Sequence, residues 1–339
     1  QTLYRVSSSS PVVQALEKAV QNGKQVTVLM EVKARFDEAN NILMARRLEK
    51  AGAHVIYGLV GLKTHSKCTL VIRREKDGIR RYVHVATGNY NASTAKLYTD
   101  LGILTCSDRF GIDASAFFNL LSGYSDPPIW DSFIVAPINL RQRCIELIDR
   151  EIHFAKNGED AHMIAKMNSL LDKGIIEKLY EASQAGVKIE LIVRGICVLI
   201  PGIPGVSDNI TVRSIVGRFL EHSRIFWFRN GGREELYVSS ADWMPRNLND
   251  RVELMVPIED PEIKRRLKQM VDIELSDNQK AHIMQADGTW LKTISAENQL
   301  CAQEYFQKIA EKRDAEDEMT LAQKLEPYTP VLGHGDGSD

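Results

Sequence analysis

The feature that most constrains the fold of this chain is a plan of secondary structure that occurs twice. Residues 11–22 carry apolar side chains at helical spacing and stop at a glycine, and the β-branched run 25–32 follows. Residues 175–185 repeat the helix with its terminal glycine, and residues 187–193 repeat the strand. Alternating helices and strands with short connections predict a layered α/β fold in both halves.

Each half continues with two strand-like runs on either side of a turn. In the first half these runs are residues 67–74 and 80–87, and the Asp-Gly dipeptide at 77–78 between them is a strong hairpin signal. In the second half the runs are residues 225–228 and 235–239. We therefore predict two similar α/β domains, each a mixed sheet flanked by helices.

The break between the two domains is predicted at the DPP sequence of residues 126–128, because proline cannot continue a helix. The first domain is then expected to comprise residues 1–131 and the second residues 132–315. Residues 316–339 are acidic and then rich in glycine, so we expect a disordered tail. The chain opens with Gln1 in a strand-like stretch, and we expect that an upstream part of the protein has been removed.

Composition argues against several classes of protein. The 339 residues have a formal net charge of -2, so the whole-chain charge gives no indication of a nucleic-acid or membrane partner. Five scattered cysteines without a CxxC pair indicate neither a zinc site nor a disulfide framework and favour a reducing cytoplasm. No apolar run reaches the roughly 18 residues of a spanning helix, and no GxxxxGK[ST] nucleotide loop occurs.

The first candidate site is a histidine paired with a cation. His65 and Lys67 stand two residues apart at the start of a predicted strand, and residues two apart in an extended segment face the same side. His222 and Arg224 stand at the corresponding place of the second half. A single histidine beside a strand is most often structural, whereas two such pairs at matching positions of a repeat predict a functional site.

A polar segment follows the return strand in each half, at residues 87–91 and at residues 239–243. Small and amide side chains there are predicted to line the site and to donate hydrogen bonds to an anion. Asn89 and Asn91 among them are also candidates for orienting groups of the site.

An acid recurs on the next predicted strand of each half, as Asp100 and Glu253. A carboxylate bonded to one imidazole nitrogen fixes the tautomer and leaves the other nitrogen free to attack or to donate a proton. We therefore predict an orienting role for both acids, with solvent-facing ion pairs as the alternative.

Three arginines fall at or just after predicted strand ends, where α/β sheets place ligands. They are Arg5, Arg35 and Arg194. A guanidinium binds phosphate in bidentate fashion and keeps its charge at working pH, so these positions predict phosphate contacts. A solvated surface arginine is the alternative for each of them.

Paired histidine–cation motifs in duplicated α/β domains resemble the phospholipase D superfamily. A closer resemblance, covering the chain to about residue 315, is to the two C-terminal domains of the polyphosphate kinase family. The segments that carry this resemblance are residues 2–5 (TLYR), 31–38 (EVKARFDE), 61–67 (GLKTHSK), 87–91 (TGNYN), 97–100 (LYTD), 191–195 (LIVRG) and 239–243 (SSADW).

The resemblance implies a kinase that moves phosphate reversibly between ATP and inorganic polyphosphate. It implies that His65 is phosphorylated by the γ-phosphate of ATP, with His222 as its partner across a cleft. It also implies that Tyr98, Arg194 and His222 contact the nucleotide phosphates.

The resemblance further places Arg5 and Arg35 with a magnesium–phosphate cluster. Arginine cannot ligate a cation, so we interpret both residues as phosphate clamps, with Mg²⁺ held mainly by phosphate oxygens and water. Lys67 and Arg224 are expected to bind phosphate beside them.

The expected partners are ATP or ADP and polyphosphate, and no nucleic acid. Members of the family commonly form oligomers and can associate peripherally with membranes. For the full-length protein the resemblance therefore implies a homo-oligomer in the cytoplasm that can contact the inner face of the membrane. Relative to the family, the N-terminal and head domains are absent, and with them the adenine contact that they supply.

Two other functions stay open at this point. A phospholipase D-like phosphodiesterase or nuclease would use the same two histidines, but its motif places Asp five residues after the lysine, where Ile72 and Arg229 stand here. A non-catalytic polyanion-binding module would keep the fold without the chemistry.

Overall fold

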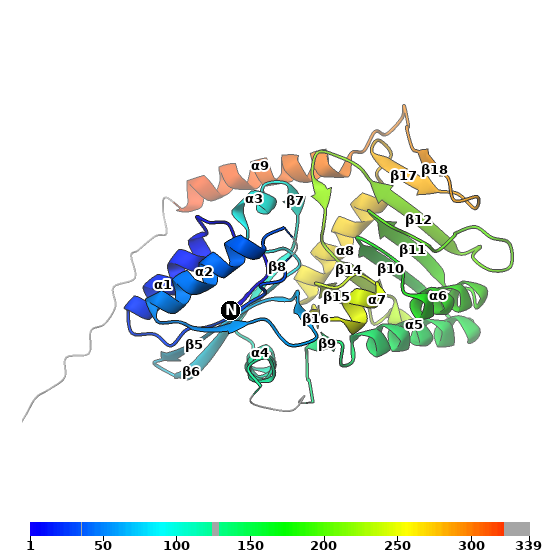
Figure 1. The fold of residues 1–339 in the computed structure, drawn as a ribbon. Coiled ribbons are helices and arrows are strands. Elements are labelled where there is room, and N and C mark those ends of the chain that lie inside the picture. Colours follow the sequence, from blue (N-terminus) through cyan, green and yellow to red (C-terminus); the bar gives the residue numbers. More distant parts are fainter. Residues whose placement is uncertain (35, 124–128, 322–339) are drawn as a thin grey trace, which may run out of the picture.

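The computed structural model describes residues 1–34, 36–123 and 129–321, with side chains up to residue 313. Its first half contains a parallel sheet with two covering helices and an antiparallel sheet backed by a third helix (Figure 1). In chain order its elements are β1 (Thr2–Leu3), α1 (Pro11–Gln21), β2 (Thr27–Met30), α2 (Glu38–Ala51), β3 (His54–Tyr57), β4 (Lys63–Thr64), β5 (Lys67–Glu75), β6 (Gly78–Ala86), α3 (Ala92–Ala95), β7 (Tyr98–Thr99), β8 (Gly102–Thr105) and α4 (Asp108–Leu121).

The second half is built around one large mixed sheet, with α5 and α6 packed together on one face (Figure 1). Its elements are β9 (Ile134–Ala136), α5 (Leu140–Lys156), β10 (His162–Met167), α6 (Lys173–Gln184), β11 (Lys188–Val193), β12 (Ile210–Ile215), β13 (Leu220–Glu221), β14 (Ile225–Phe228), the 3₁₀ turn η1 (Asn230–Gly232), β15 (Glu235–Ser239), α7 (Pro245–Asn249), β16 (Arg251–Pro257), α8 (Pro261–Leu275), β17 (Ala281–Met284), β18 (Trp290–Lys292) and α9 (Ala302–Leu321).

Strand order confirms the predicted repeat. The second half runs β12-β11-β10-β14-β15-β16 across its sheet, with the first three strands parallel and the next three antiparallel. The first half runs β3-β2-β1 in its parallel sheet and β5-β6-β8 in its antiparallel sheet. The side chain of Thr2 joins these two sheets by accepting from the Cys68 amide at 2.9 Å and donating to the Ser66 carbonyl at 2.8 Å. Both halves therefore follow one plan.

Local capping explains where several helices begin and end. Ser10 caps α1 by accepting from the Val13 amide at 3.4 Å, and a proline follows it at the first helical position. Asp172 caps α6 in the same way through the amide of Ile175. Gly52 ends α2 in the left-handed conformation with φ 101°, which glycine adopts without strain.

Four apolar cores hold the layers of the described part together, and the buried residues of one of them come from both halves. Phe117 of α4 and Cys68 of β5 are fully buried there with Phe133 and with Val252 and Leu254 of β16. Burying apolar surface removes it from water at roughly 25 cal/mol per Å², so this shared core couples the two halves energetically. The halves are therefore fixed relative to each other, and side chains from both can build one site.

The C-terminal part of the second half departs from the simple repeat. Helix α9 continues to Leu321, so residues 316–321 are helical although we expected the disordered tail to begin at residue 316. The rest of that expected tail, residues 322–339, and the whole predicted break at 126–128 lie outside the described residues. Among the helices of the described part, none combines the length and the apolar character that crossing a membrane requires.

Candidate active site

Two short parallel ladders join the halves and place the two predicted histidines. In the first ladder Thr64 of β4 pairs with Val252 of β16, and the amides of His65 and Ser66 both donate to the Val252 carbonyl, at 3.0 and 2.9 Å. The next residue in sequence is His65, just after β4, on one side and Glu253 of β16 on the other. The ladder therefore brings a histidine of the first half against an acid of the second.

The second ladder makes the same arrangement in reverse. Glu221 of β13 pairs with Thr99 of β7, and the amide of His222 donates to the Thr99 carbonyl at 3.2 Å. One residue further on, His222 meets Asp100 of the first half. We expected Asp100 on a strand, and that was wrong: it lies in the link between β7 and β8.

The first histidine is tied through one ring nitrogen only. His65 Nδ1 lies 2.9 Å from both carboxylate oxygens of Glu253. Glu253 is fully buried and is held by Ser240 Oγ and Asn247 Nδ2, which each donate at 2.6 Å. Burial raises the pKa of Glu253, against the attraction of Lys67 and Arg251. When Glu253 is ionised it can only accept, so the proton of neutral His65 is then on Nδ1 and the lone pair is on Nε2. Within the described part of the chain, Nε2 makes no hydrogen bond.

The second histidine is also tied to an acid through Nδ1, but Arg224 Nη1 lies 3.3 Å from its Nε2 as well. His222 Nδ1 lies 2.7 Å from Asp100 Oδ1, and Thr87 Oγ1 donates to the same oxygen at 2.6 Å. A Cβ on Gly88 would lie 2.3 Å from Asp100 Oδ2, which no side chain could accommodate without moving that carboxylate. The small residue that we assigned to the approach of an anion therefore makes room for the orienting acid itself.

Lys67 and Arg224 play matching structural parts. Lys67 Nζ donates to the backbone carbonyl of His65, and Arg224 Nη1 donates to the carbonyl of His222 at 2.6 Å. Both cations are almost completely buried, with 1% and 3% of their surface exposed. Arg224 also makes a two-point ion pair with Asp242, at 3.1 and 3.3 Å. The predicted HxK and HxR pairs are thus built alike.

Burial and neighbouring cations keep both histidines neutral. Burial, followed by the charge of Lys67, holds the pKa of His65 well below its ordinary value of 6.5. Burial and Arg224 lower the pKa of His222 to about 4, although Asp100 opposes them. Burial also lowers the pKa of Lys67 to about 7, against the attraction of Glu253. These shifts favour neutral imidazoles near pH 7, and Lys67 gives up its proton more readily than an exposed lysine does.

Each histidine also faces one tyrosine ring. Tyr4 meets His65 edge to face with ring centroids 4.8 Å apart, and Tyr98 meets His222 with centroids 5.1 Å apart. Tyr98 was predicted for the site, whereas Tyr4 was named only as part of a segment. The guanidinium of Arg5 lies 5.4 Å from the centre of the Tyr4 ring and forms an ion pair with Asp37.

The structure brings Arg194 toward the second histidine. Its Nε donates to Asn168 Oδ1 at 2.8 Å, and Asn168 Nδ2 donates to the carbonyl of His222 at 3.3 Å. Burial lowers the pKa of Arg194, against the attraction of Asp242. Arg35, which we predicted beside Arg5, lies outside the described residues.

The two predicted asparagines do not contact either histidine. Asn91 Oδ1 accepts from the amides of Ser93 and Thr94, both at 3.0 Å, and so caps the short helix α3. Asn89 Oδ1 is buried and accepts no hydrogen bond from the part of the chain that the structure describes. An amide oxygen can only accept a hydrogen bond, so this atom cannot make the predicted donation to an anion.

Arg251 is a site residue that sequence reasoning missed. Its Nη1 lies 3.9 Å from Glu253 Oε1, and its charge lowers the pKa of His65. The sequence could have indicated this position, because Arg251 stands two residues before Glu253 on one strand and therefore shares its face. Ser240 and Asp242 were quoted only within the segment 239–243.

A buried ion triad braces the strand that leads into His222. Lys166 of β10 donates to Glu221 Oε2 at 2.7 Å and to Glu274 of α8, and all three side chains are at most 5% exposed. Gln303 of α9 adds a bond to Glu221 Oε1 at 2.6 Å, and Thr99 adds one to Oε2 at 2.8 Å. Strands β7 and β10 and helix α9 thus contact the residue before His222 directly, and helix α8 does so through Lys166.

The side chains present favour an anion over a protein-bound metal. Four cations gather near the two histidines, namely Lys67, Arg194, Arg224 and Arg251. The nearby acids are already engaged, Glu253 and Asp100 with the histidines and Asp242 with Arg224. Over residues 1–34, 36–123 and 129–321, no group of three or more His, Cys, Asp or Glu side chains could hold a metal ion. A phosphate-rich substrate suits this arrangement.

Comparison with protein families gives matches over nearly the whole chain. Residues 1–127 match the family described as polyphosphate kinase C-terminal domain 1, and residues 133–303 match polyphosphate kinase C-terminal domain 2.

Curated relatives agree with these matches. A polyphosphate kinase of Halalkalibacterium halodurans is 61% identical over 281 residues, which cover 83% of this chain and 40% of the relative. A polyphosphate kinase of Synechocystis is 55% identical over 314 residues, covering 91% and 43%. The chain therefore spans less than half the length of the curated relatives that it matches.

Solved structures resemble the chain in the same way. The crystal structure of a polyphosphate kinase from Porphyromonas gingivalis matches with a TM-score of 0.85 at 38% identity, covering 93% of this chain and 48% of that one. A phosphatidylserine synthase of Haemophilus influenzae matches in fold alone, with a TM-score of 0.55 at 12% identity over 94% and 88% of the two chains. The predicted fold class is confirmed.

Proposed function

The chain belongs to the polyphosphate kinase family, and we propose that it forms the phosphotransfer centre of such an enzyme, which moves the γ-phosphate of ATP reversibly to polyphosphate. We propose a phosphohistidine on His65 as the intermediate. The observation that carries this proposal is the state of His65, which is buried and neutral, with Nδ1 tied to Glu253 and Nε2 bare. A histidine in this state is ready to act as a nucleophile.

In the first step, the Nε2 lone pair of His65 attacks the γ-phosphorus in line with the leaving group. The N–P bond forms as the bond from the γ-phosphorus to the β–γ bridging oxygen breaks, and ADP leaves with that electron pair. Glu253 keeps the Nδ1 proton in place and stabilises the charge that develops on the ring. In the second step, a terminal oxygen of polyphosphate attacks the same phosphorus and frees Nε2.

The cations of the site are proposed to stabilise the negative charge on the phosphate group that is transferred. Lys67 and Arg224 flank the histidines, and Arg194 lies beside His222 through Asn168. Fixed donors in a buried site stabilise a developing negative charge without having to reorganise. We assign Tyr98, Arg194 and His222 to the nucleotide phosphates, and His222 also to proton transfer at the oxygen that enters or leaves.

Magnesium is proposed as part of the substrate, bound to ATP through phosphate oxygens and water. This agrees with the lack of a suitable cluster of ligands in the described residues. Arg5 and Arg35 are proposed to clamp the phosphates that carry this ion. No step above depends on a protein-bound metal.

The broader expectations rest on family membership alone. We propose functional halves at residues 1–131 and 132–315, and a full-length protein that forms a homo-oligomer in the cytoplasm and can contact the inner face of the membrane. A phosphodiesterase is less well supported, because its motif acid is replaced by Ile72, which is 57% exposed, and by Arg229, which pairs with Glu234.

Incubation with γ-labelled ATP and Mg²⁺ tests the proposal. Acid-labile, base-stable label is expected on this chain or on its full-length protein, absent from His65→Ala and retained in His54→Ala, where the removed histidine is exposed. Label on the full-length protein alone would show that this chain lacks a sufficient grip on the nucleotide. No label on either protein, together with hydrolysis of phosphodiesters, would refute the kinase assignment.

A further inference from the structure

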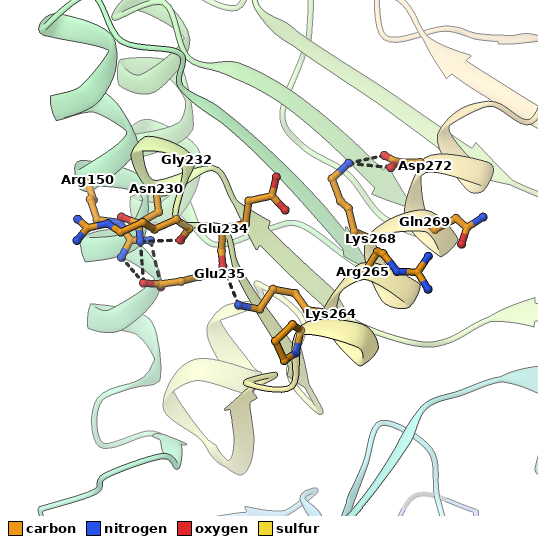
Figure 2. Close-up of a pocket in the computed structure, with 12 residues that line it drawn as sticks. Arg150, Asn230, Gly232, Glu234, Glu235, Lys264, Arg265, Lys268, Gln269 and Asp272 are labelled. Atoms are coloured by element: carbon orange, nitrogen blue, oxygen red, sulfur yellow. Dashed lines mark hydrogen bonds and ion pairs between the residues drawn. The ribbon is translucent and has the colours of Figure 1, made fainter.

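A large groove lies away from the histidines, between the turn that follows β14 and one face of α8 (Figure 2). Its volume is about 1090 Å³, far more than a single phosphate group occupies. The groove is lined by Arg150, Asn230, Gly232, Arg233, Glu234, Glu235, Pro261, Lys264, Arg265, Lys268, Gln269 and Asp272.

The carboxylates of the groove are already engaged. Arg150 makes a two-point ion pair with Glu235 at 2.9 and 3.1 Å. Lys268 binds Asp272 at 2.6 and 2.8 Å, as Figure 2 shows. The third carboxylate, that of Glu234, accepts from Arg229 at 3.2 Å and from the indole of Trp227 at 3.3 Å. These pairs leave little negative charge available to other cations.

Three further cations face the groove without a carboxylate partner. Lys264 Nζ donates to the backbone carbonyl of Glu234 at 2.9 Å, which does not neutralise its charge. Arg233 and Arg265 are exposed, and their side chains make no ion pair with any residue that the structure describes. A local excess of positive charge on a chain with a formal net charge of -2 favours an anionic ligand.

The groove is separate from the phosphotransfer centre. His222 stands just before β14, and Arg229 stands just after it, so the strand separates the histidine from the groove. At about 3.3 Å per residue, the extended segment between them spans roughly 20 Å. No single phosphate group can reach both places, whereas a long linear chain can.

We propose that this groove binds a segment of linear polyphosphate away from the end that reacts. The proposal rests on the proposed function, which makes polyphosphate a substrate. Arginine and lysine are the side chains that bind phosphate oxygens, and three of them are free of carboxylates here. Holding the polymer at a second point raises the effective concentration of its end at the site and so favours repeated transfers to one chain.

Equilibrium binding of end-labelled long-chain polyphosphate tests the proposal without any need for catalysis. The groove variant is Arg233→Glu, Lys264→Glu and Arg265→Glu together. The matched control is Lys18→Glu, Lys24→Glu and Lys50→Glu, which makes the same charge change at exposed positions of the first half. We expect the groove variant to bind at least about 10-fold more weakly and the control less than about 2-fold, because screening limits the effect of distant charges.

Thermal unfolding of both variants shows that they are folded, and His65→Ala separates the two proposals. Groove binding is expected to persist in His65→Ala, whereas phosphohistidine labelling is not. Equal affinity of the groove variant and the control would overturn the groove site, as would undetectable binding by the unmodified chain. Loss of labelling specificity at His65, with groove binding intact, would count against the proposed mechanism and leave the groove site standing.

Discussion

His65 Nδ1 lies 2.9 Å from both carboxylate oxygens of Glu253, a residue 188 positions further along the chain. The second histidine repeats this relationship in reverse through Asp100. Both contacts follow from the two-residue ladders that pair β4 with β16 and β7 with β13. Each half therefore supplies the orienting acid for the histidine of the other.

Replacing Glu253 with glutamine is expected to slow phosphohistidine formation by about 100-fold or more, because an amide can hold the wrong tautomer of His65. Single-turnover labelling with γ-labelled ATP measures the rate, and ¹⁵N chemical shifts of the imidazole report the tautomer. Glu190→Gln is the matched control, since Glu190 binds His162 at 2.7 Å on the sheet away from the site. An unchanged rate in Glu253→Gln would contradict the orienting role.

Replacing Gly88 with alanine is expected to mimic the loss of Asp100, because the new methyl group would occupy the place of that carboxylate. The measurement compares the rate of phosphohistidine labelling in Gly88→Ala, in Asp100→Asn and in the double variant that carries both substitutions. The double variant should be no slower than the slower single variant, since all three changes release His222. Gly174→Ala is the control, because its Cβ would have no neighbour closer than 3.6 Å. If the two substitutions together slowed labelling by the product of their separate effects, Gly88 and Asp100 would have independent roles.

The pKa of Lys67, lowered to about 7 by burial, predicts an alkaline decline in labelling at low ATP. Lys67 loses its proton as pH rises through about 7, and its stabilisation of phosphate is lost with that charge. Lys67→Arg should retain charge and so flatten the decline, whereas Lys63→Arg nearby should not. Labelling rates of the parent and both variants, measured from about pH 5.5 to 9, test this prediction. The same decline in Lys67→Arg would exclude Lys67 as its source.

Glu274 makes the stability of the chain depend on pH. Burial raises the pKa of Glu274 from 4.5 to about 7, so between these values the folded state binds more protons than the unfolded state. The contribution of this group to the free energy of unfolding is therefore present at low pH and is lost as pH rises through about 7. Glu274→Gln removes this loss, and its stability relative to the parent should rise by about 2 kcal/mol between pH 5 and 8.

Urea unfolding at pH 5 and pH 8 measures this difference. Glu262→Gln on the same helix is the control, because Glu262 is exposed. It should shift stability by the same small amount at both pH values. A difference between Glu274→Gln and the parent that does not change with pH would mean that Glu274 stays ionised in the folded chain.

Local patterns in the sequence were enough to predict the repeat and both histidine–cation pairs. Helix α1 and the β5–β6 hairpin follow from apolar spacing and turn residues that lie close together in the chain. The pairing of each histidine with its acid could not be predicted in this way. Strands β4 and β7 contain two residues each, too few to show a period, and their partners are far away in sequence.

Two side chains have partners that the sequence did not reveal. Asn91 was predicted to face an anion, but an asparagine that precedes a helix finds nearer donors in the amides of that helix. No role was predicted for Lys166, because a lysine within an apolar strand gives no sign in the sequence that it pairs with two buried carboxylates. Both outcomes depend on partners that spacing alone does not reveal.

The exchange of acids between the halves also constrains how such a chain can evolve. If the halves arose by duplication, neither copy could change the segment around its histidine alone. The acid that orients each histidine lies in the other copy. A substitution that weakens the grip of Glu253 on His65 can be compensated near β4, in a different part of the gene. Suppressor mutations selected against defects in one half should therefore map to the other half, and the two halves should remain under joint selection.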